Sequence, residues 1–293
     1  MFFNQIKTAV LLATLSGILM TIGMLLGGTN GLILFTIISL CINGYAYFFS
    51  DKLVLRMYKA EPLDKAKYSS IHTMVGELAH EAKLPMPKLW LVPMEVPNAF
   101  ATGRNPQHAS VAVTTGILSL LDESELRGVL AHELSHVKNR DILISSIAAT
   151  LATAIGFTAY MMRNMAMFGG MSRDSEKRGN PLALLVISIL MPIAASLIQL
   201  AISRSREYLA DESGADLCRD PLALASALQK LEFKSKEAQL RGDESINPTT
   251  AHLFIVKPFS FGGLSNLFAT HPPMHKRIER LQAIYEKMSY RGR

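Results

Sequence analysis

Two histidines four residues apart, in the segment His132-Glu133-Leu134-Ser135-His136, form the part of the sequence whose side chains can act together in chemistry. On a helix these two positions stand about 40° apart around the axis, so both imidazoles can reach one ion. Glu133 stands about 100° from His132, beside the ion, where a general base can take a proton from a water molecule on zinc. The segment therefore predicts hydrolysis at a zinc ion.

A catalytic zinc site needs a third protein ligand besides these histidines. A histidine six residues after the second is excluded because that position is Ile142, and an aspartate within a Leu-Asp-Gly sequence is excluded because no such tripeptide follows His136. The remaining common choice is a glutamate on a second helix, and Glu207 is the best candidate. Asp211 lies one turn further on the same face, where it can accept a hydrogen bond from the far nitrogen of a ligand histidine. Without a metal, Glu207 would be a solvated carboxylate paired with a neighbouring arginine.

Three further groups of side chains are candidates for a role at such a site. His271 precedes two prolines and is the preferred donor to the oxyanion that develops in the reaction; the alternative is a loop histidine of no special role. Arg277 is expected to pair with Asp211 or with another acidic residue near the site, unless it is an exposed helical cation. Arg204 and Arg206 either grip substrate carbonyls or, as we favour, extend to lipid headgroups.

The helix that carries the two histidines has a recognisable start. Asp122 and Glu125 have the spacing of a capping box, in which each side chain accepts a hydrogen bond from the other residue's backbone. We expect this helix to continue without a break from about Glu123 into the apolar residues from 142 onward. Gly128 in its interior costs roughly 1 kcal/mol relative to alanine, which is best tolerated where another helix or a metal-site neighbour approaches closely.

Hydrophobic residues make up 49% of the 293 residues and concentrate in four uncharged stretches, at residues 8–28, 31–50, 142–162 and 181–203. Each has about 20 residues, enough for a helix to cross roughly 30 Å of hydrocarbon. Any one of them could be a buried core helix, and the first could be a cleaved signal peptide. Four together favour membrane spans, and the glycine-rich residues 27–31 predict a hairpin between the first two.

Between these stretches, the expected secondary structure combines helices with a few short strands. Residues 65–83 form an amphipathic pattern typical of a helix, and residues 88–92 and 109–114 are expected to be strands. Residues 98–103 are interpreted as a turn or short strand. The strand at 109–114, taken as an edge strand, fits a rail for an extended peptide and a plain scaffold strand equally well. Helices are also expected through 211, from 221 to about 242, and after Pro273.

The net charge of +6 does not indicate nucleic-acid binding, because the basic residues form no single patch interleaved with aromatic residues. Many of them flank the apolar stretches instead, which predicts contact with anionic lipid headgroups. Only two cysteines occur, Cys41 in the second apolar stretch and Cys218 in a polar context. No disulfide is expected between them, and the chain is compatible with a reducing compartment.

The position of the candidate ligands relative to the apolar stretches restricts the topology. His136 precedes the third stretch by six residues, and Glu207 follows the fourth by four. Both side chains must reach one ion, so the chain has to leave and return on the same face of the bilayer, as two crossings allow. The metal is therefore expected at the membrane surface, within reach of a peptide that emerges from lipid.

With these features the chain resembles the HtpX group of bacterial membrane zinc endopeptidases, relatives of the CAAX prenyl proteases within the gluzincins. The resemblance covers nearly the whole chain and includes the N-terminal hairpin, Asn98-Ala-Phe-Ala-Thr-Gly103, Ala131-His-Glu-Leu-Ser-His136, Ser203-Arg-Ser-Arg-Glu207 with Ala210-Asp211, and Thr270-His-Pro-Pro-Met-His-Lys-Arg277. It implies His132, His136 and Glu207 as ligands of one zinc ion per subunit and Glu133 as the catalytic base. It also implies a multi-pass protein of the bacterial inner membrane, with its active site facing the cytoplasm, in protein quality control and the stress response.

We therefore expect a mainly α-helical integral membrane protein with four transmembrane helices and a zincin-like α+β metalloprotease domain. Residues 1–50 would form one transmembrane hairpin and residues 142–203 a second with a polar loop, while 51–141 and 204–293 would form the two parts of the protease domain. The expected partners are membrane-protein substrates, unfolded polypeptides and the lipid bilayer, without nucleic acid.

Two other functions are considered beside this one. The first is trimming of prenylated C-termini, which the length of the chain and its four apolar stretches disfavour. The second is a non-catalytic membrane adaptor whose metal site is structural or empty. An intact Glu133 argues against the adaptor, because a structural site has no need of a base at that position.

Overall fold

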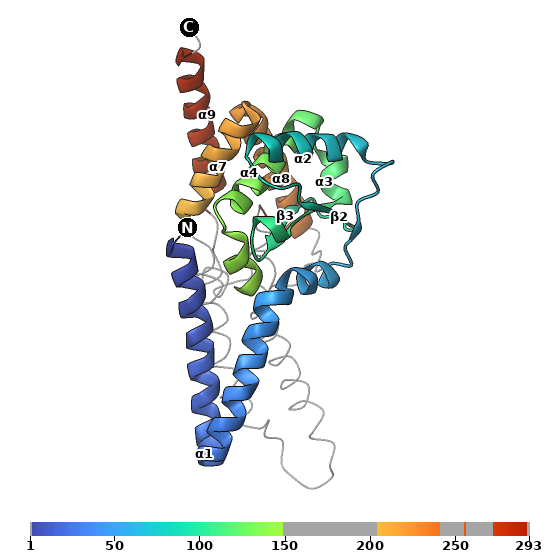
Figure 1. The fold of residues 1–293 in the computed structure, drawn as a ribbon. Coiled ribbons are helices and arrows are strands. Elements are labelled where there is room, and N and C mark those ends of the chain that lie inside the picture. The colour runs from blue at the N-terminus through green and yellow to red at the C-terminus, as the bar shows by residue number, and fades with distance from the viewer. Residues whose placement is uncertain (1, 149–203, 241–254, 256–271, 292–293) are drawn as a thin grey trace.

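A computed structural model of the chain describes residues 2–148, 204–240, 255 and 272–291. Three expectations fall outside these residues: most of the third apolar stretch, the whole of the fourth with the polar loop before it, and the placement of His271. The described part contains a long helical hairpin and a body of helices packed around a small sheet, from which the hairpin projects (Figure 1).

The hairpin is formed by α1, Phe2–Met57, which reverses direction at Gly27 and Gly28. Gly28 has φ 56° and ψ −140°, a left-handed conformation that glycine adopts without a steric penalty. The two legs are tied together by polar side chains, since the Ser39 hydroxyl donates to Ser16 Oγ over 2.8 Å and Asn43 Nδ2 donates to the same oxygen over 2.8 Å. The chain thus reverses within residues 27–31, as predicted.

The second leg of the hairpin, Gly27–Met57, is long and apolar enough to cross a membrane, and it is the one such helix in the described part of the chain. A shorter apolar helix, Leu12–Thr21, lies in the first leg. Of the four expected spans, the structure therefore supports one by its length and composition. The expected second hairpin, at residues 142–203, lies mostly outside the described residues.

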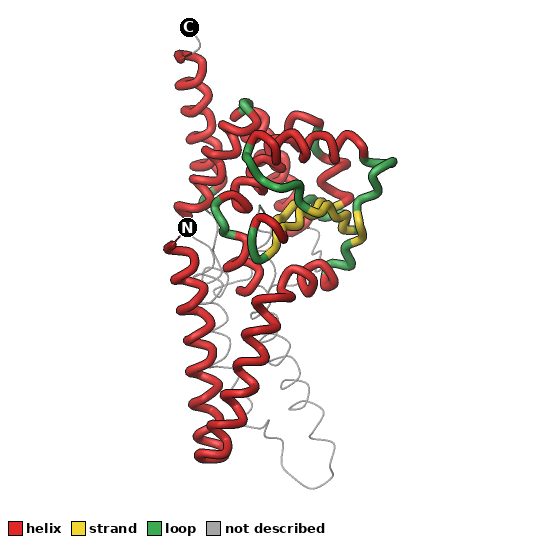
Figure 2. Tube along the Cα trace, viewed as in Figure 1, coloured by secondary structure: helices red, strands yellow, loops and turns green. Residues whose placement is uncertain are grey.

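The sheet, yellow in Figure 2, contains the strands β1 Glu61–Pro62, β2 Lys88–Val92, β3 Ala99–Gly103 and β4 Ala109–Thr114. Their order across the sheet is β1-β2-β4-β3. β4 runs parallel to β2 and antiparallel to β3, so the expectation that residues 109–114 form an edge strand is wrong. The reason is that residues 98–103, expected as a turn or short strand, pair with β4 from Ala99 opposite Val113 to Gly103 opposite Ala109. β3 is consequently the edge strand on this side of the sheet, and β1 is the edge strand on the other side.

In the described residues the body also contains the helices α2 Ser69–Glu81, α3 Thr115–Leu120, α4 Glu123–Lys138, α7 Arg204–Cys218, α8 Pro221–Leu240 and α9 Met274–Arg291. A single turn of 3₁₀ helix, Pro106–His108, connects β3 to β4. α4 is the central helix of the body, because it packs against α2, α7, α8 and the edge strand β3. The core that these elements share includes the fully buried side chains Val75, Leu78, Val129, Leu130, Leu134, Leu224 and Leu228.

Both ends of α4 are defined by local hydrogen bonds. At its start the predicted capping box is confirmed, because Glu125 N–H donates to Asp122 Oδ1 over 2.9 Å and Asp122 N–H donates to Glu125 Oε2 over 3.0 Å. At its end the expectation of a continuous helix is wrong: α4 stops at Lys138, and Arg140 has a left-handed φ of 58°. The reversal lets Asp141 N–H donate to the carbonyl of His136 over 2.9 Å.

Two glycines allow the helices around α4 to approach it closely. A Cβ on Gly128 would lie 3.0 Å from the backbone nitrogen of Leu224 in α8, which confirms that another helix approaches at this position. A Cβ on Gly214 of α7 would lie 2.9 Å from both the Cα and the backbone nitrogen of His132. The contact at Gly214 therefore sets the distance between α7 and the histidine-bearing helix.

Replacement of Gly214 by alanine should destabilise the protein by about 1–3 kcal/mol, because the added methyl group overlaps the backbone of α4. Gly76, inside α2, is the matched control, since a Cβ there meets nothing within 4 Å. Gly76→Ala should stabilise the protein by up to about 1 kcal/mol through its helix propensity. Urea unfolding of the detergent-solubilised variants, followed by circular dichroism, measures both changes. Shifts of the same sign in the two variants would contradict this account of the helix contact.

Candidate metal centre

Three potential ligand atoms from two helices converge at one point in the body. His132 and His136 project from α4 and Glu207 from α7, and their ligand atoms all lie within 4.8 Å of one another. The two Nε2 atoms are 3.2 Å apart, His136 Nε2 is 3.6 Å from Glu207 Oε1, and His132 Nε2 is 3.9 Å from Glu207 Oε2. His132 and Glu207 are buried, whereas His136 is partly accessible.

These distances fit the coordination of a metal ion. Ligands about 2.0–2.1 Å from a tetrahedral ion lie roughly 3.3–3.4 Å from each other, close to the shorter of the separations found here. Two imidazole nitrogens and one carboxylate oxygen are also a donor set that first-row metals accept. The three residues named from the sequence are therefore brought together in an arrangement that can hold a metal ion with one position left open.

The second ring nitrogen of His132 faces a buried ion pair. His132 Nδ1 lies 3.0 Å from Asp211 Oδ1, as expected for an aspartate one turn after Glu207. Arg277 from α9 binds Asp211 through two hydrogen bonds, from Nε to Oδ2 over 2.8 Å and from Nη2 to Oδ1 over 2.6 Å. This bidentate geometry is the strong form of an arginine–carboxylate pair, and it confirms the expected partner of Arg277.

Complete burial makes this pair energetically important. Arg277 is 0% exposed, and its Nη1 also lies 3.5 Å from the carbonyl of Ile255 and 3.7 Å from Glu207 Oε2. Burial alone would lower the pKa of Arg277, but the charge and hydrogen bonds of Asp211 raise it. Burial alone would raise the pKa of Asp211, but Arg277 holds it below its ordinary value. Both groups are therefore charged, and removal of either one would leave an uncompensated buried charge.

The second ring nitrogen of His136 faces Asp141, a residue that the sequence analysis did not assign to the site. His136 Nδ1 lies 3.2 Å from Asp141 Oδ2, and Arg206 Nη1 of α7 lies 3.6 Å from Asp141 Oδ1. The favoured expectation that Arg206 extends to lipid headgroups is therefore wrong, because its side chain turns inward and is 12% exposed. The sequence signal that could have assigned Asp141 to the site is its place directly before an apolar stretch.

Glu133 is held by the edge strand of the sheet. Its Oε2 accepts a hydrogen bond from the backbone N–H of Ala101 in β3 over 2.9 Å. Burial raises the pKa of Glu133, and although the neighbouring histidines oppose this shift, the negative charge of Glu207 adds to it. The carboxylate is thus oriented by the sheet and lies in the field of the three potential ligands.

The field of the cluster favours a positive charge at its centre. Burial alone would lower the pKa of His136, but the hydrogen bond to Asp141 and the charges of Glu207 and Glu133 raise it to about 9. The same carboxylates that stabilise a proton on this imidazole would stabilise a metal cation. The distances between the ligand atoms and the carboxylate charges around them thus both indicate that the cluster can hold a metal cation.

Segments distant in the sequence hold β3 against this cluster. Asn98, directly before β3, accepts a hydrogen bond from Ile255 N–H over 3.1 Å, and Ile255 in turn contacts Arg277. At the other end of the strand, Thr102 Oγ1 and Ser146 Oγ are 2.6 Å apart. His271, the expected oxyanion donor, lies outside the described residues. The structure describes the residues that follow it, from position 272 into α9.

Comparison with known proteins agrees with this site. The family model "Peptidase family M48" matches residues 65–285. A "Protease HtpX homolog" of Syntrophobacter fumaroxidans is 51% identical over 283 residues, which cover 96% of this chain and 99% of that protein. The "Protease HtpX homolog" of Sulfurihydrogenibium sp. is 50% identical over 291 residues and 97% of each chain. That of Aquifex aeolicus is 51% identical over 277 residues, covering 93% of this chain and 90% of that one.

A solved structure shares the fold at much lower sequence identity. The crystal structure of S. mikatae Ste24p superposes with a TM-score of 0.53 and 17% identity, over 96% of this chain. This chain spans 66% of the length of that one. The likeness supports the described fold of the body and its hairpin.

Asp141→Ala should weaken metal binding by about 10- to 100-fold, because His136 loses the carboxylate that orients its ring. Competition with a chromogenic chelator measures the dissociation constant directly, without relying on activity. Glu81→Ala, at an exposed carboxylate of α2, is the control and should leave it unchanged. An Asp141→Ala protein that binds metal as tightly as the unaltered one would show that Asp141 does not orient His136.

Proposed function

Since the chain belongs to peptidase family M48 and is a metalloprotease of the HtpX type, we propose that it is an integral membrane zinc endopeptidase. In this proposal it cleaves misfolded or damaged membrane proteins, and unfolded polypeptides, at the cytoplasmic surface of the bacterial inner membrane during protein quality control and stress. The observation that carries the proposal is the convergence of His132, His136 and Glu207 beside a buried Glu133 that the sheet holds in place.

Zinc is the metal that best suits the proposed ligands. Two imidazoles and a carboxylate, with one position open, are the ligand set of a catalytic rather than a structural zinc site. We propose one zinc ion per subunit, bound by His132, His136 and Glu207. When bound, zinc supplies Lewis acidity, which activates a water molecule and stabilises the negative charge that develops on the scissile carbonyl oxygen.

Glu133 is the proposed general base and general acid. It accepts the proton of the attacking water and later delivers that proton to the leaving amine. Burial raises the pKa of its carboxyl group, which brings its proton affinity closer to that needed at neutral pH. The hydrogen bond from Ala101 to Oε2 fixes the orientation of the carboxylate, so less freedom is lost when the substrate is bound.

His271 is the proposed donor to the oxyanion. Support comes from α9, whose Arg277 is anchored to Asp211 in the metal centre. His271 precedes the first residue of α9, Met274, by three positions, so the chain that bears it leads into a helix start close to the cluster. Asp211 and Arg277 would act by holding His132, not by contact with the substrate.

The proposed membrane arrangement has two hairpins, at residues 1–50 and 142–203, and a protease domain built from residues 51–141 and 204–293. The contact between Asp141 and Arg206 supports it, because these residues flank the second proposed hairpin and lie 3.6 Å apart. A chain that leaves the body after Asp141 and returns before Arg206 must re-enter on the same side. The cluster is then confined to one face of the bilayer, where loops and unfolded segments of membrane proteins reach it at high effective concentration.

Glu133→Gln should retain zinc and the folded structure but lose peptide cleavage, because glutamine is nearly isosteric and cannot accept the proton. Cleavage of an unfolded test protein by the detergent-solubilised enzyme gives the activity, and elemental analysis gives the zinc content. Zinc without cleavage in the unaltered protein would favour a non-catalytic adaptor. More than trace cleavage by Glu133→Gln would remove this residue from the proposed mechanism.

Glu207→Ala should lose most of its zinc on dialysis against a mild chelator, because two histidines alone hold the ion weakly. Glu212→Ala is the matched control, since Glu212 lies on the same helix but is exposed. The zinc content of the two variants after dialysis is the measurement. Equal zinc contents would mean that the third ligand lies elsewhere, and His271 would be the next residue to test.

A further inference from the structure

Four exposed aromatic side chains, Tyr45, Tyr47, Phe48 and Phe49, form a cluster near the end of the hairpin's second leg, and we refer to them as the aromatic cluster. They are 37–54% exposed and touch one another, with Tyr45 stacked on Phe49 at 5.2 Å and Tyr47 edge-on to Phe48 at 5.0 Å between ring centroids. Nearer the turn, the exposed large hydrophobic side chains of this leg are aliphatic: Ile33, Leu34, Ile37, Ile38, Leu40 and Ile42. A change from aliphatic to aromatic residues is typical of the boundary between hydrocarbon and headgroups.

The distance of this cluster from the hairpin turn agrees with that boundary. Phe48 lies 20 residues after Gly28 (48 − 28), and Lys7, the first charged residue of the other leg, lies 20 residues before Gly27 (27 − 7). At 1.5 Å per residue, 20 residues of helix span about 30 Å, the thickness of the hydrocarbon core. Both legs therefore reach the same membrane surface at the level of the aromatic cluster.

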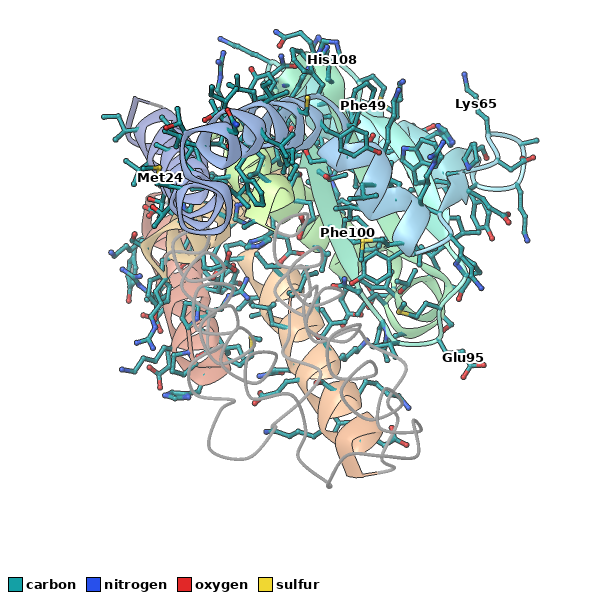
Figure 3. All side chains as sticks on the ribbon, turned by 90° about the horizontal axis from the view of Figure 1, so that it is seen from below. Met24, Phe49, Lys65, Glu95, Phe100 and His108 are labelled. Atoms are coloured by element: carbon teal, nitrogen blue, oxygen red, sulfur yellow. The ribbon has the colours of Figure 1, made fainter. Side chains whose placement is uncertain are left out.

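The turn between β3 and β4 lies at this level too. Arg104, the residue after β3, places its guanidinium 5.5 Å from the centroid of Phe48. The same guanidinium donates a hydrogen bond to His108 Nε2 over 2.9 Å, and His108 Nδ1 donates to Asn105 Oδ1 over 2.8 Å. Lys52 Nζ lies 5.3 Å from the centroid of Phe49. Seen along the hairpin from its turn, Phe49 and His108 lie toward the same edge of the molecule (Figure 3). Two cationic side chains, those of Arg104 and Lys52, thus lie against rings of the aromatic cluster.

We propose that Arg104 and Lys52 bind the phosphate groups of anionic phospholipids and thereby seat the β3–β4 turn on the membrane surface, while His108 orients the guanidinium of Arg104. The proposal rests on the membrane location argued under the proposed function. An arginine fork and an ammonium group suit phosphate oxygens, and anionic headgroups attract basic residues at the surface. In the part of the chain that the structure describes, neither Arg104 nor Lys52 forms an ion pair with a carboxylate, so their charges are available to lipid.

Such a contact would act on the metal centre through β3 itself. The strand begins five residues before Arg104, and its Ala101 holds Glu133 over 2.9 Å. α1 also reaches this strand, because Val54 and Leu55 pack with Phe100 in one buried cluster and Tyr58 lies 5.5 Å from the Phe100 ring. Headgroup binding at the turn and the packing of α1 would together keep the edge strand at one height above the bilayer. Substrate segments that emerge from the bilayer at this position would then lie directly beside the strand.

The test uses the full chain in lipid nanodiscs, with Cys41 and Cys218 replaced by serine and one fluorophore attached through Gln107→Cys. Quenching by nitroxides on lipid headgroups reports contact of the turn with the membrane, as phosphatidylglycerol is titrated into phosphatidylcholine. A second probe at Tyr47→Cys reports the aromatic cluster. We expect both probes to be quenched, and quenching at position 107 to increase with phosphatidylglycerol.

Arg104→Gln should raise the phosphatidylglycerol content at half-maximal quenching of the 107 probe by about fivefold, the factor for one basic residue at an anionic surface, and Arg104→Lys should restore part of it. Arg127→Gln, at an arginine paired with Glu77 in the body, is the matched control and should have no effect. An unquenched 107 probe beside a quenched 47 probe, or equal titrations for Arg104→Gln and Arg127→Gln, would overturn the headgroup contact alone. If the 47 probe is unquenched as well, the proposed membrane location fails.

Discussion

Close approach of α4 and α7 is the constraint on which the rest of the structure depends. Glu207 reaches the two histidines only if these helices pack almost backbone to backbone, and Gly214 against His132 leaves no space for a side chain. Alanines at 210 and 215 continue this small, buried face of α7. One turn before His132, on nearly the same face of α4, Gly128 admits α8. The histidine-bearing helix is thus enclosed from several directions, and its side chains have little freedom to move away from a common ion.

Close packing also buries many charges, which must be compensated. Glu133, Glu207, Asp141 and Asp211 are all buried around the cluster, and buried carboxylates are costly unless paired. Arg277 compensates Asp211 through two short hydrogen bonds, and Arg206 lies near Asp141. Negative charge remains in excess close to the ligands. A metal cation is the natural counter-charge, so the same electrostatics that would destabilise an empty site favours occupation by a metal ion.

The edge strand β3 connects this metal centre to the hairpin. Its Ala101 orients Glu133, its Phe100 packs under the last turns of α1, and the residue after it contacts the aromatic cluster. A peptide hydrolase has to position its base to within fractions of an ångström, and the proposed base Glu133 is held by an element that also touches the hairpin. The proposed positions of the membrane surface and of the catalytic base are therefore linked through one strand.

The sequence by itself determined the features that depend on local spacing. The histidine pair, the capping box at Asp122 and the reversal at Gly28 could be predicted because helix periodicity and side-chain chemistry restrict them. For Arg277 the sequence left Asp211, another acidic residue and an exposed position open, and the packing of α9 against α7 decided for Asp211. Only the tertiary structure decided that β3, not β4, is the edge strand, that α4 ends at Lys138, and that Asp141 faces His136. Strand order and helix ends depend on long-range contacts: periodicity shows which face of an element is buried, but not which distant segment covers it.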